Sequence, residues 1–117
     1  MITITNTYGV ELDKVTEYRM TLDKNIKSIK DVPDGTSIEL DKIIEFIDEK
    51  EDGKVEELFS IMATDGAVYA TNSKTFKEDV VNIVNVFAGS EITPTIIKLS
   101  DQSRNGRTFN YAILKSN

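Results

Sequence analysis

Apolar and polar side chains alternate over short distances from Ser37 to Ala63. Within Ser37–Asp48, the apolar residues at 38, 40, 44 and 46 share one period-2 face, and those at 43 and 47 lie on the other. Two apolar faces in one extended segment predict a long strand that is curved or bulged. A further strand is expected at Val55–Ala63, and the acidic segment Glu49–Lys54, which contains Gly53, is expected to be the hairpin loop between them.

Turn residues mark where other extended segments begin and end. Pro33-Asp34-Gly35 and Asp65-Gly66 combine proline or aspartate with glycine, which is typical of tight turns. We expect a short strand at Tyr18–Leu22 before the first turn, and extended chain at Ala67–Thr71 after the second. The first fifteen residues alternate threonine and isoleucine before Tyr8-Gly9, and they fit either a loose arm or an added edge strand.

The period of the apolar residues changes after Thr71. Five residues with helical spacing predict one amphipathic helix whose apolar face packs in the core: Phe76, Val80, Ile83, Val84 and Phe87. Thr75 and Glu78 form a capping-box pattern at its start, and Gly89 is placed to end it. Two final strands are expected at Thr95–Leu99 and Thr108–Leu114, with Asn105-Gly106 as the tight turn of their hairpin.

The order of these elements is strand, strand, strand, helix, strand, strand. This order is that of an OB-fold, so we predict a mainly β protein: an OB-fold-like, five-stranded Greek-key barrel with one α-helix between strands 3 and 4. A chain of 117 residues suits one compact domain. Residues 1–16 are expected to be the N-terminal arm or extra strand, and residues 17–117 the single OB-fold domain.

Composition argues against several classes of function. The chain has no cysteine and no histidine, which removes disulfides, thiolate zinc sites and the commonest general base. Asp48–Phe59 imitates a calcium loop, but Lys50 and Phe59 occupy ligand positions. We therefore expect neither an enzyme nor a bound metal or cofactor. Without an apolar run of about 20 residues or a signal-like N-terminus, we expect a soluble, intracellular protein that does not contact membranes.

Charge is distributed unevenly along the chain. From Glu39 to Glu57, nine acids face three lysines, a difference equal to the whole net charge of −6. From Ile92 onward there are four cations and one acid. A negative net charge argues against a protein that wraps around duplex DNA, although one part of the surface can still be positive.

Cations and aromatic residues gather at the final hairpin. Arg104 and Arg107, two of only three arginines in the chain, lie close to Phe109 and Tyr111. In an OB-fold, this would be a ligand-binding loop in which guanidinium groups contact phosphates and aromatic rings stack on bases. Phe109 and Tyr111 also fit the barrel core or its edge. Lys74 and Lys98 are weaker candidates for phosphate contacts, since isolated lysines are usually only solvated.

Three motifs in order carry a resemblance to a known family. They are Pro-Asp-Gly-Thr-Ser-Ile-Glu at 33–39, Ala-Thr-Asp-Gly-Ala-Val-Tyr-Ala-Thr-Asn-Ser-Lys-Thr at 63–75, and the final hairpin. Together they resemble the single-stranded DNA-binding proteins of the phi29 group of podophages, which replicate linear DNA by protein priming. The similarity covers roughly Glu17 to Lys115. The family's extra loop tyrosine has no counterpart here, where Glu49, Glu51 and Asp52 stand, and the first fifteen residues match nothing in it.

By position, the resemblance assigns base-stacking roles to Tyr69 and Phe46. Tyr69 should face away from whatever Val68 and Ala70 bury. Phe46 shares its predicted strand face with isoleucine and leucine, so a core role fits it equally well.

The resemblance implies a sequence-nonspecific, helix-destabilising protein that coats and protects displaced single strands during phage DNA replication. Its partners would be single-stranded DNA and replication proteins of the phage, in the cytoplasm of the infected bacterial host, and it would act as a monomer or homo-oligomer. A rival interpretation is a small acidic phage regulatory protein that mimics DNA, or binds a host protein, through Glu39–Glu57. A protein-binding OB module is the third alternative.

Overall fold

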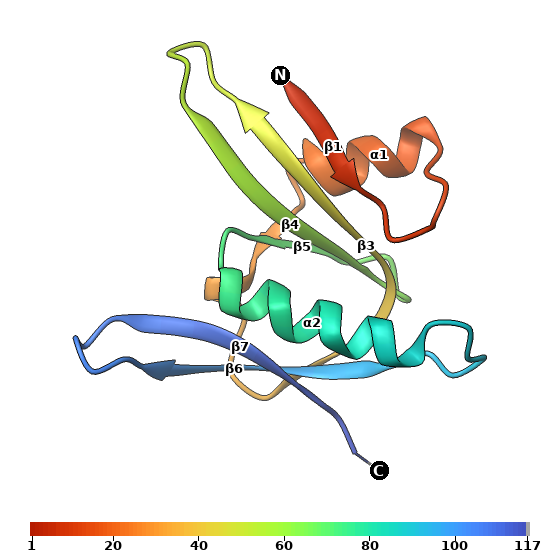
Figure 1. The fold of residues 1–117 in the computed structure, drawn as a ribbon, viewed down its shortest axis with the longest axis vertical. Helices are drawn as coiled ribbons and strands as arrows, with labels where there is room; N and C mark the ends of the chain where they lie inside the picture. Colours follow the sequence, from red (N-terminus) through yellow and green to blue (C-terminus); the bar gives the residue numbers. More distant parts are fainter. Residues whose placement is uncertain (117) are drawn as a thin grey trace.

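The computed structural model describes residues 1–116, which form a curled, mainly β fold (Figure 1). Seven strands are present among these residues: β1 Ile2–Asn6, β2 Lys27–Ser28, β3 Thr36–Glu49, β4 Val55–Ala63, β5 Val68–Thr71, β6 Thr95–Gln102 and β7 Thr108–Leu114. The two α-helices are α1, Lys14–Thr21, and α2, Lys74–Phe87, and a short 3-10 helix, η1, covers Ile29–Asp31. Asn117, the last residue of the predicted 17–117 domain, lies outside the described residues.

The strands form one sheet in the order β2-β5-β4-β3-β6-β7, and β1 also pairs with β3. All pairs are antiparallel except β2 with β5, which is parallel. A mainly β sheet curled into a half barrel is consistent with an OB-like fold. The five-stranded Greek-key barrel with one helix is not confirmed, since the described residues form seven strands and two α-helices. β1 is the extra N-terminal strand that the sequence allowed, whereas β2 and α1 were not expected.

A bulge in β3 divides the core into two clusters. The register between β3 and β4 shifts between Leu40 and Lys42, which reverses the two faces of the strand. Ile38, Leu40 and Ile43 consequently belong to one buried cluster, and Ile44 and Phe46 to another. The prediction of a bulged strand is confirmed, but the single face assigned to residues 38, 40, 44 and 46 is wrong.

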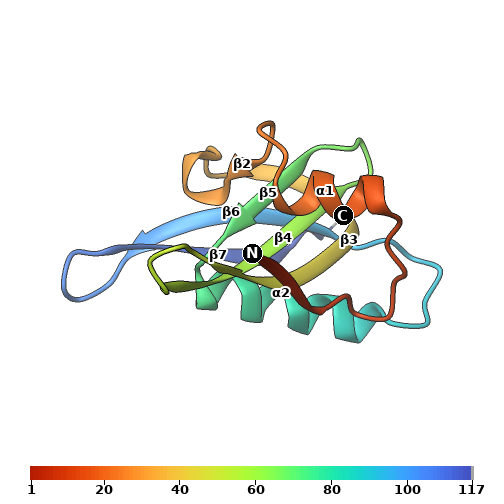
Figure 2. The ribbon, with the colours of Figure 1, turned by 90° about the horizontal axis from the view of Figure 1, so that it is seen from above.

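The two α-helices lie on opposite sides of the sheet (Figure 2). Phe76 and Val80 of α2 belong to the first cluster, and Met20 of α1 to the second. The predicted strand at Tyr18–Leu22 is therefore wrong, since this segment lies largely in α1. Its tyrosine and leucine are both exposed and only Met20 is buried, while Asp13 caps the helix by accepting from the amide of Thr16.

Helix α2 confirms the predicted amphipathic helix, with a different cap. The Ser73 hydroxyl accepts a hydrogen bond from the Phe76 amide at 3.2 Å, so Ser73, and not Thr75, is the N-cap. The helix ends before Gly89, whose φ of +79° favours glycine. Farther along α2, the Asp79 carboxylate accepts from the Ala112 amide at 3.2 Å, at the outer edge of β7.

The N-terminal segment is tied to the sheet. β1 pairs with the second half of β3, whose first half pairs with β6. Tyr8 has a positive φ of 55°, and its hydroxyl donates to Glu45, which also pairs with Lys77 of α2. Burial, followed by the hydrogen bond to Glu45, raises the pKa of Tyr8. One carboxylate thus connects the N-terminal segment, β3 and α2.

No helix within residues 1–116 combines the length and the hydrophobicity that spanning a membrane would require.

Candidate nucleic-acid interface

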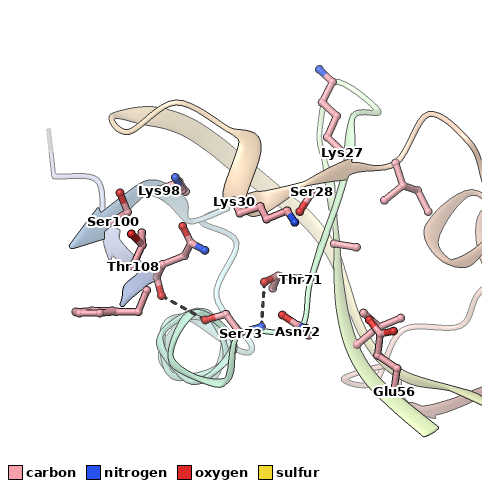
Figure 3. A pocket seen from close by; sticks show the side chains of 15 residues that line it. Lys27, Ser28, Lys30, Glu56, Thr71, Asn72, Ser73, Lys98, Ser100 and Thr108 are labelled. Carbon is pink, nitrogen blue, oxygen red and sulfur yellow. Dashed lines mark hydrogen bonds between the residues drawn. The ribbon is translucent and has the colours of Figure 1, made fainter. Parts of the chain in front are cut away.

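The molecule has a groove of about 710 Å³, here called the main groove (Figure 3). On one side it is lined by β2, η1, β4 and the end of β5, and on the other by β6 and β7. Fifteen residues line it: Ile26, Lys27, Ser28, Lys30, Glu56, Leu58, Ala70, Thr71, Asn72, Ser73, Lys98, Ser100, Thr108, Phe109 and Asn110. Three lysines and one glutamate give this lining a formal charge of +2, in a chain whose net charge is −6.

Two of these lysines are exposed cations. Lys30, from η1, extends over the groove above Thr71 and Asn72, whereas Lys27 of β2 stands at the rim and points outward (Figure 3). Within residues 1–116 neither takes part in an ion pair, which leaves both ammonium groups able to meet an anion. Lys27 also lies 5.9 Å from the centre of the Tyr69 ring.

Lys98 has a structural role that its sequence context did not reveal. It is 2% exposed, and its ammonium donates to the Val32 carbonyl at 2.8 Å and the Asp34 carboxylate at 3.0 Å. The hydrogen bond from Lys98, followed by that from Ser100, holds the pKa of Asp34 below its ordinary value. The candidate phosphate contact at Lys98 is therefore corrected, because this cation is already paired and buried beside the groove.

The base of the groove is fixed by hydrogen bonds around Ser73. The Ser73 amide donates to the Thr71 hydroxyl at 3.0 Å, and the Ser73 hydroxyl donates to the Asn110 carbonyl at 3.4 Å (Figure 3). These contacts join the end of β5, the start of α2 and β7. The two walls of the groove are thereby joined at its base.

Phe46 and Tyr69 are both placed in the core. Phe46 is 2% exposed in the second cluster, because the bulge turns its face toward α1, and its ring is not free to stack. Tyr69 does face away from the cluster that contains Val68, but it points into the first cluster and is 9% exposed. Burial, followed by the negative charge of Asp65, raises its pKa. A base could stack on this ring only after side chains around it moved.

The candidates of the final hairpin remain accessible. Arg104 and Arg107 are exposed at its tip, where the Ser103 amide donates to the Arg107 carbonyl at 2.8 Å. Five residues, Ser103 to Arg107, connect β6 and β7, and Gly106 among them takes the positive φ of 76°. Phe109 and Tyr111 are half-buried, with ring centres 5.9 Å apart, and of the two only Phe109 lines the main groove.

Lys74, at the start of α2, is exposed but lies outside the main groove, in a smaller recess beside it. The sequence-predicted residues are thus divided among the groove, its hairpin, this recess and the core.

Sequence reasoning missed Lys27, Lys30 and Asn72 as groove residues. The two lysines occur singly in a polar stretch, with no pattern to distinguish them from ordinary solvated lysines. They reach the groove because β2 pairs in parallel with β5, bringing Lys27 opposite Tyr69. Of the three, only Asn72 could have been identified from the sequence, since it lies inside the 63–75 motif next to the helix cap.

Within residues 1–116, no three carboxylates converge in a way that could hold a metal ion.

Comparison with known protein families supports the binding of a polyanion. No curated protein and no solved structure matches the chain. A family model described as phage single-stranded DNA-binding protein, of the phi29 type, matches residues 14–113. That match covers most of the chain, including every residue that lines the main groove. The chain therefore belongs to the phi29-type family of phage single-stranded DNA-binding proteins.

Proposed function

We propose that this protein coats and protects displaced single strands during phage DNA replication, without sequence preference. The observation that carries the proposal is the main groove, which presents two exposed lysines, Lys27 and Lys30, that belong to no ion pair within residues 1–116, in a chain whose net charge is −6. Lys27 and Lys30 would contact phosphates, and Phe109 would offer its ring to a base. The exposed Arg104 and Arg107 at the hairpin tip would hold the strand where it leaves the groove.

The fold proposed for this role is an OB barrel. Strands β3, β4 and β5 would be its first three strands, α2 the helix that follows, and β6 and β7 its last two. The main groove would then lie between the third and fifth strands. β1, β2 and α1 would be additions to this five-stranded Greek-key unit.

The biological setting is also part of the proposal. The protein would act in the cytoplasm of the infected bacterial host as a helix-destabilising binding protein with no catalytic step. Single-stranded DNA would be its main partner, and phage replication proteins would meet it on the coated strand.

Titration with a long oligo-dT, followed by tyrosine fluorescence, tests this function. Four tyrosines and no tryptophan are present, so the signal reports tyrosine alone. We expect saturable quenching by oligo-dT and little response to duplex DNA of equal length. Absence of binding to either nucleic acid at low salt would contradict the proposal.

Charge variants distinguish this function from DNA mimicry. Reversing both Arg104 and Arg107 to glutamate should abolish or strongly weaken oligo-dT binding. Neutralising Glu49, Glu51 and Asp52, which lie in the opposite hairpin, should leave it intact or strengthen it. The reverse pattern would favour an acidic protein that occupies the nucleic-acid site of a host protein.

A further inference from the structure

A second recess adjoins the main groove. It has a volume of about 310 Å³ and is lined by β1, β3, β4 and the first turn of α2. Four residues line both hollows: Leu58, Thr71, Asn72 and Ser73. The two spaces therefore meet at the end of β5, where Asn72 is exposed and Ser73 is half-buried.

The two hollows lie on opposite faces of β4. Phe59 pairs with Thr71, the last residue of β5, so Val55–Leu58 extend past the end of their neighbouring strand. Glu56 lines only the main groove, and Glu57 lines only the second recess, because successive side chains of a strand point to opposite faces. An extended chain in the main groove can reach the second recess by passing Asn72.

The second recess differs from the main groove in charge. Its charged lining residues are Lys74, Lys77, Glu45 and Glu57, which sum to zero. Lys77 and Glu45 already pair with each other, which leaves Lys74 and Glu57 to set the local field. Both are exposed, and within residues 1–116 neither takes part in an ion pair. Lys74 is thus a free cation at the point where a strand leaving the main groove would arrive.

We propose that a bound single strand passes from the main groove over Asn72 and Ser73 into the second recess. The inference rests on the proposed function and extends it, since it defines the path and length of the bound DNA. Lys30 then contacts every bound oligonucleotide. Lys74 contacts a phosphate only when the strand is long enough to reach it.

The neighbouring carboxylates Glu56 and Glu57 allow a matched test. Oligo-dT of about 4 to 16 nucleotides covers the range of site sizes known for OB domains. At low salt, Glu56→Gln should tighten binding at every length by about 1.5- to 5-fold, the scale of one exposed charge interaction. Glu57→Gln should tighten it by a similar factor only above a threshold length.

Lys74→Ala should change the affinity for oligo-dT in the opposite direction, again only above the threshold length. Above it, binding weakens and the log–log salt dependence becomes shallower by about 0.7, the contribution of one phosphate of a single strand. Below it, affinity equals that of the unchanged protein. Lys115→Ala, at the end of β7 away from the groove, is the control that should change nothing, and thermal melting checks that each variant is folded.

Two results separate failure of this inference from failure of the proposed function. If the unchanged protein binds oligo-dT while Glu57→Gln and Lys74→Ala have no effect, or the same effect at all lengths, the path through the second recess is wrong. If the unchanged protein binds no oligonucleotide, the proposed function falls and this path falls with it.

Discussion

Lys98 stabilises the fold beside the groove with a charge that solvent hardly reaches. Its ammonium holds the Val32 carbonyl and the Asp34 carboxylate, and it does so from β6, on the opposite wall from Lys30. Because the Pro33-Asp34-Gly35 turn leads directly into β3, these bonds fix the start of the central strand against β6. The same side chain thus sets the position of one groove wall.

Replacing Lys98 with alanine should destabilise the protein by about 1 to 3 kcal/mol, the usual cost of leaving a buried polar group without its partner. Urea unfolding followed by far-ultraviolet circular dichroism measures the change. Lys115→Ala, an exposed lysine, should stay within about 0.5 kcal/mol of the unchanged protein. Equal stability of the two variants would mean that the Lys98 contacts are not formed in solution.

Glu45 should make stability depend on pH. Burial favours its neutral form, but the hydrogen bonds from Lys77 and Tyr8 outweigh burial and lower the pKa of this carboxyl. Since the folded pKa lies below the unfolded one, the stabilisation is complete above the unfolded pKa. It is lost as the pH falls through the folded pKa.

The free energy of unfolding, measured from pH 7 to pH 3 for the unchanged protein and for Glu45→Gln, tests this. The difference between the two should be largest near neutral pH and should shrink in acid. A difference that stays constant over this range would contradict the assigned pKa shift.

The sequence singled out some of the candidate interface residues and not others. Arg104, Arg107 and Phe109 were selected because cations and aromatic residues cluster near one turn, and their contacts with DNA stay a prediction. Lys27 and Lys30 could not be found, since their role depends on the parallel pairing of β2 with β5, a contact between distant segments. In the sequence, nothing distinguishes Lys98 from a solvated lysine. Only its hydrogen-bond partners in the fold reveal its structural role.

Elements were predictable where the apolar pattern had a single explanation. The spacing in α2 fits a helix alone, and the long alternation of β3 and β4 fits strands alone. At Tyr18–Leu22, three large residues at alternate positions imitated a strand, although only the middle one is buried in α1. The bulge in β3 was expected, but its place could not be read from the sequence, so the faces beyond it were misassigned.

The start of α2 gives a test at this scale. Ser73→Ala should cost about 1 kcal/mol of stability, since it removes the hydroxyl that accepts from the Phe76 amide. Thr75→Ala should cost less, because Thr75 lies inside the helix and is exposed. Thermal melting of both variants gives the comparison, and a larger loss for Thr75→Ala would restore the capping box expected from the sequence.

At the scale of the whole molecule, acidic and basic surfaces are carried by two separate hairpins. The β3–β4 hairpin carries Glu49, Glu51 and Asp52 at its tip, and the β6–β7 hairpin carries Arg104 and Arg107. Both project beyond the body of the fold (Figure 1). Residues close to the tip of each hairpin line the main groove, Glu56 and Leu58 on β4 and Thr108 and Phe109 on β7. Under the proposed function, we expect repulsion from the acidic hairpin to restrict strong binding to the groove and the basic hairpin.

The small positive surface predicts a shallow salt dependence. For three or four phosphates, at about −0.7 per phosphate of a single strand, the log–log slope of affinity against salt should be about −2 to −3. Oligo-dT titrations at several sodium chloride concentrations measure it. A slope near −6 would require many more phosphate contacts than the groove and hairpin offer.

The carboxylate of Asp79 has a consequence for the behaviour of concentrated protein. β7 ends the sheet, and an uncovered terminal strand is a template on which another molecule can add its own strand, the first step toward fibrils. Because α2 lies against β7, the outward amide of Ala112 already donates to the Asp79 carboxylate, and it is not free to pair with an added strand. We therefore expect the helix also to limit fibril growth from this edge of the sheet.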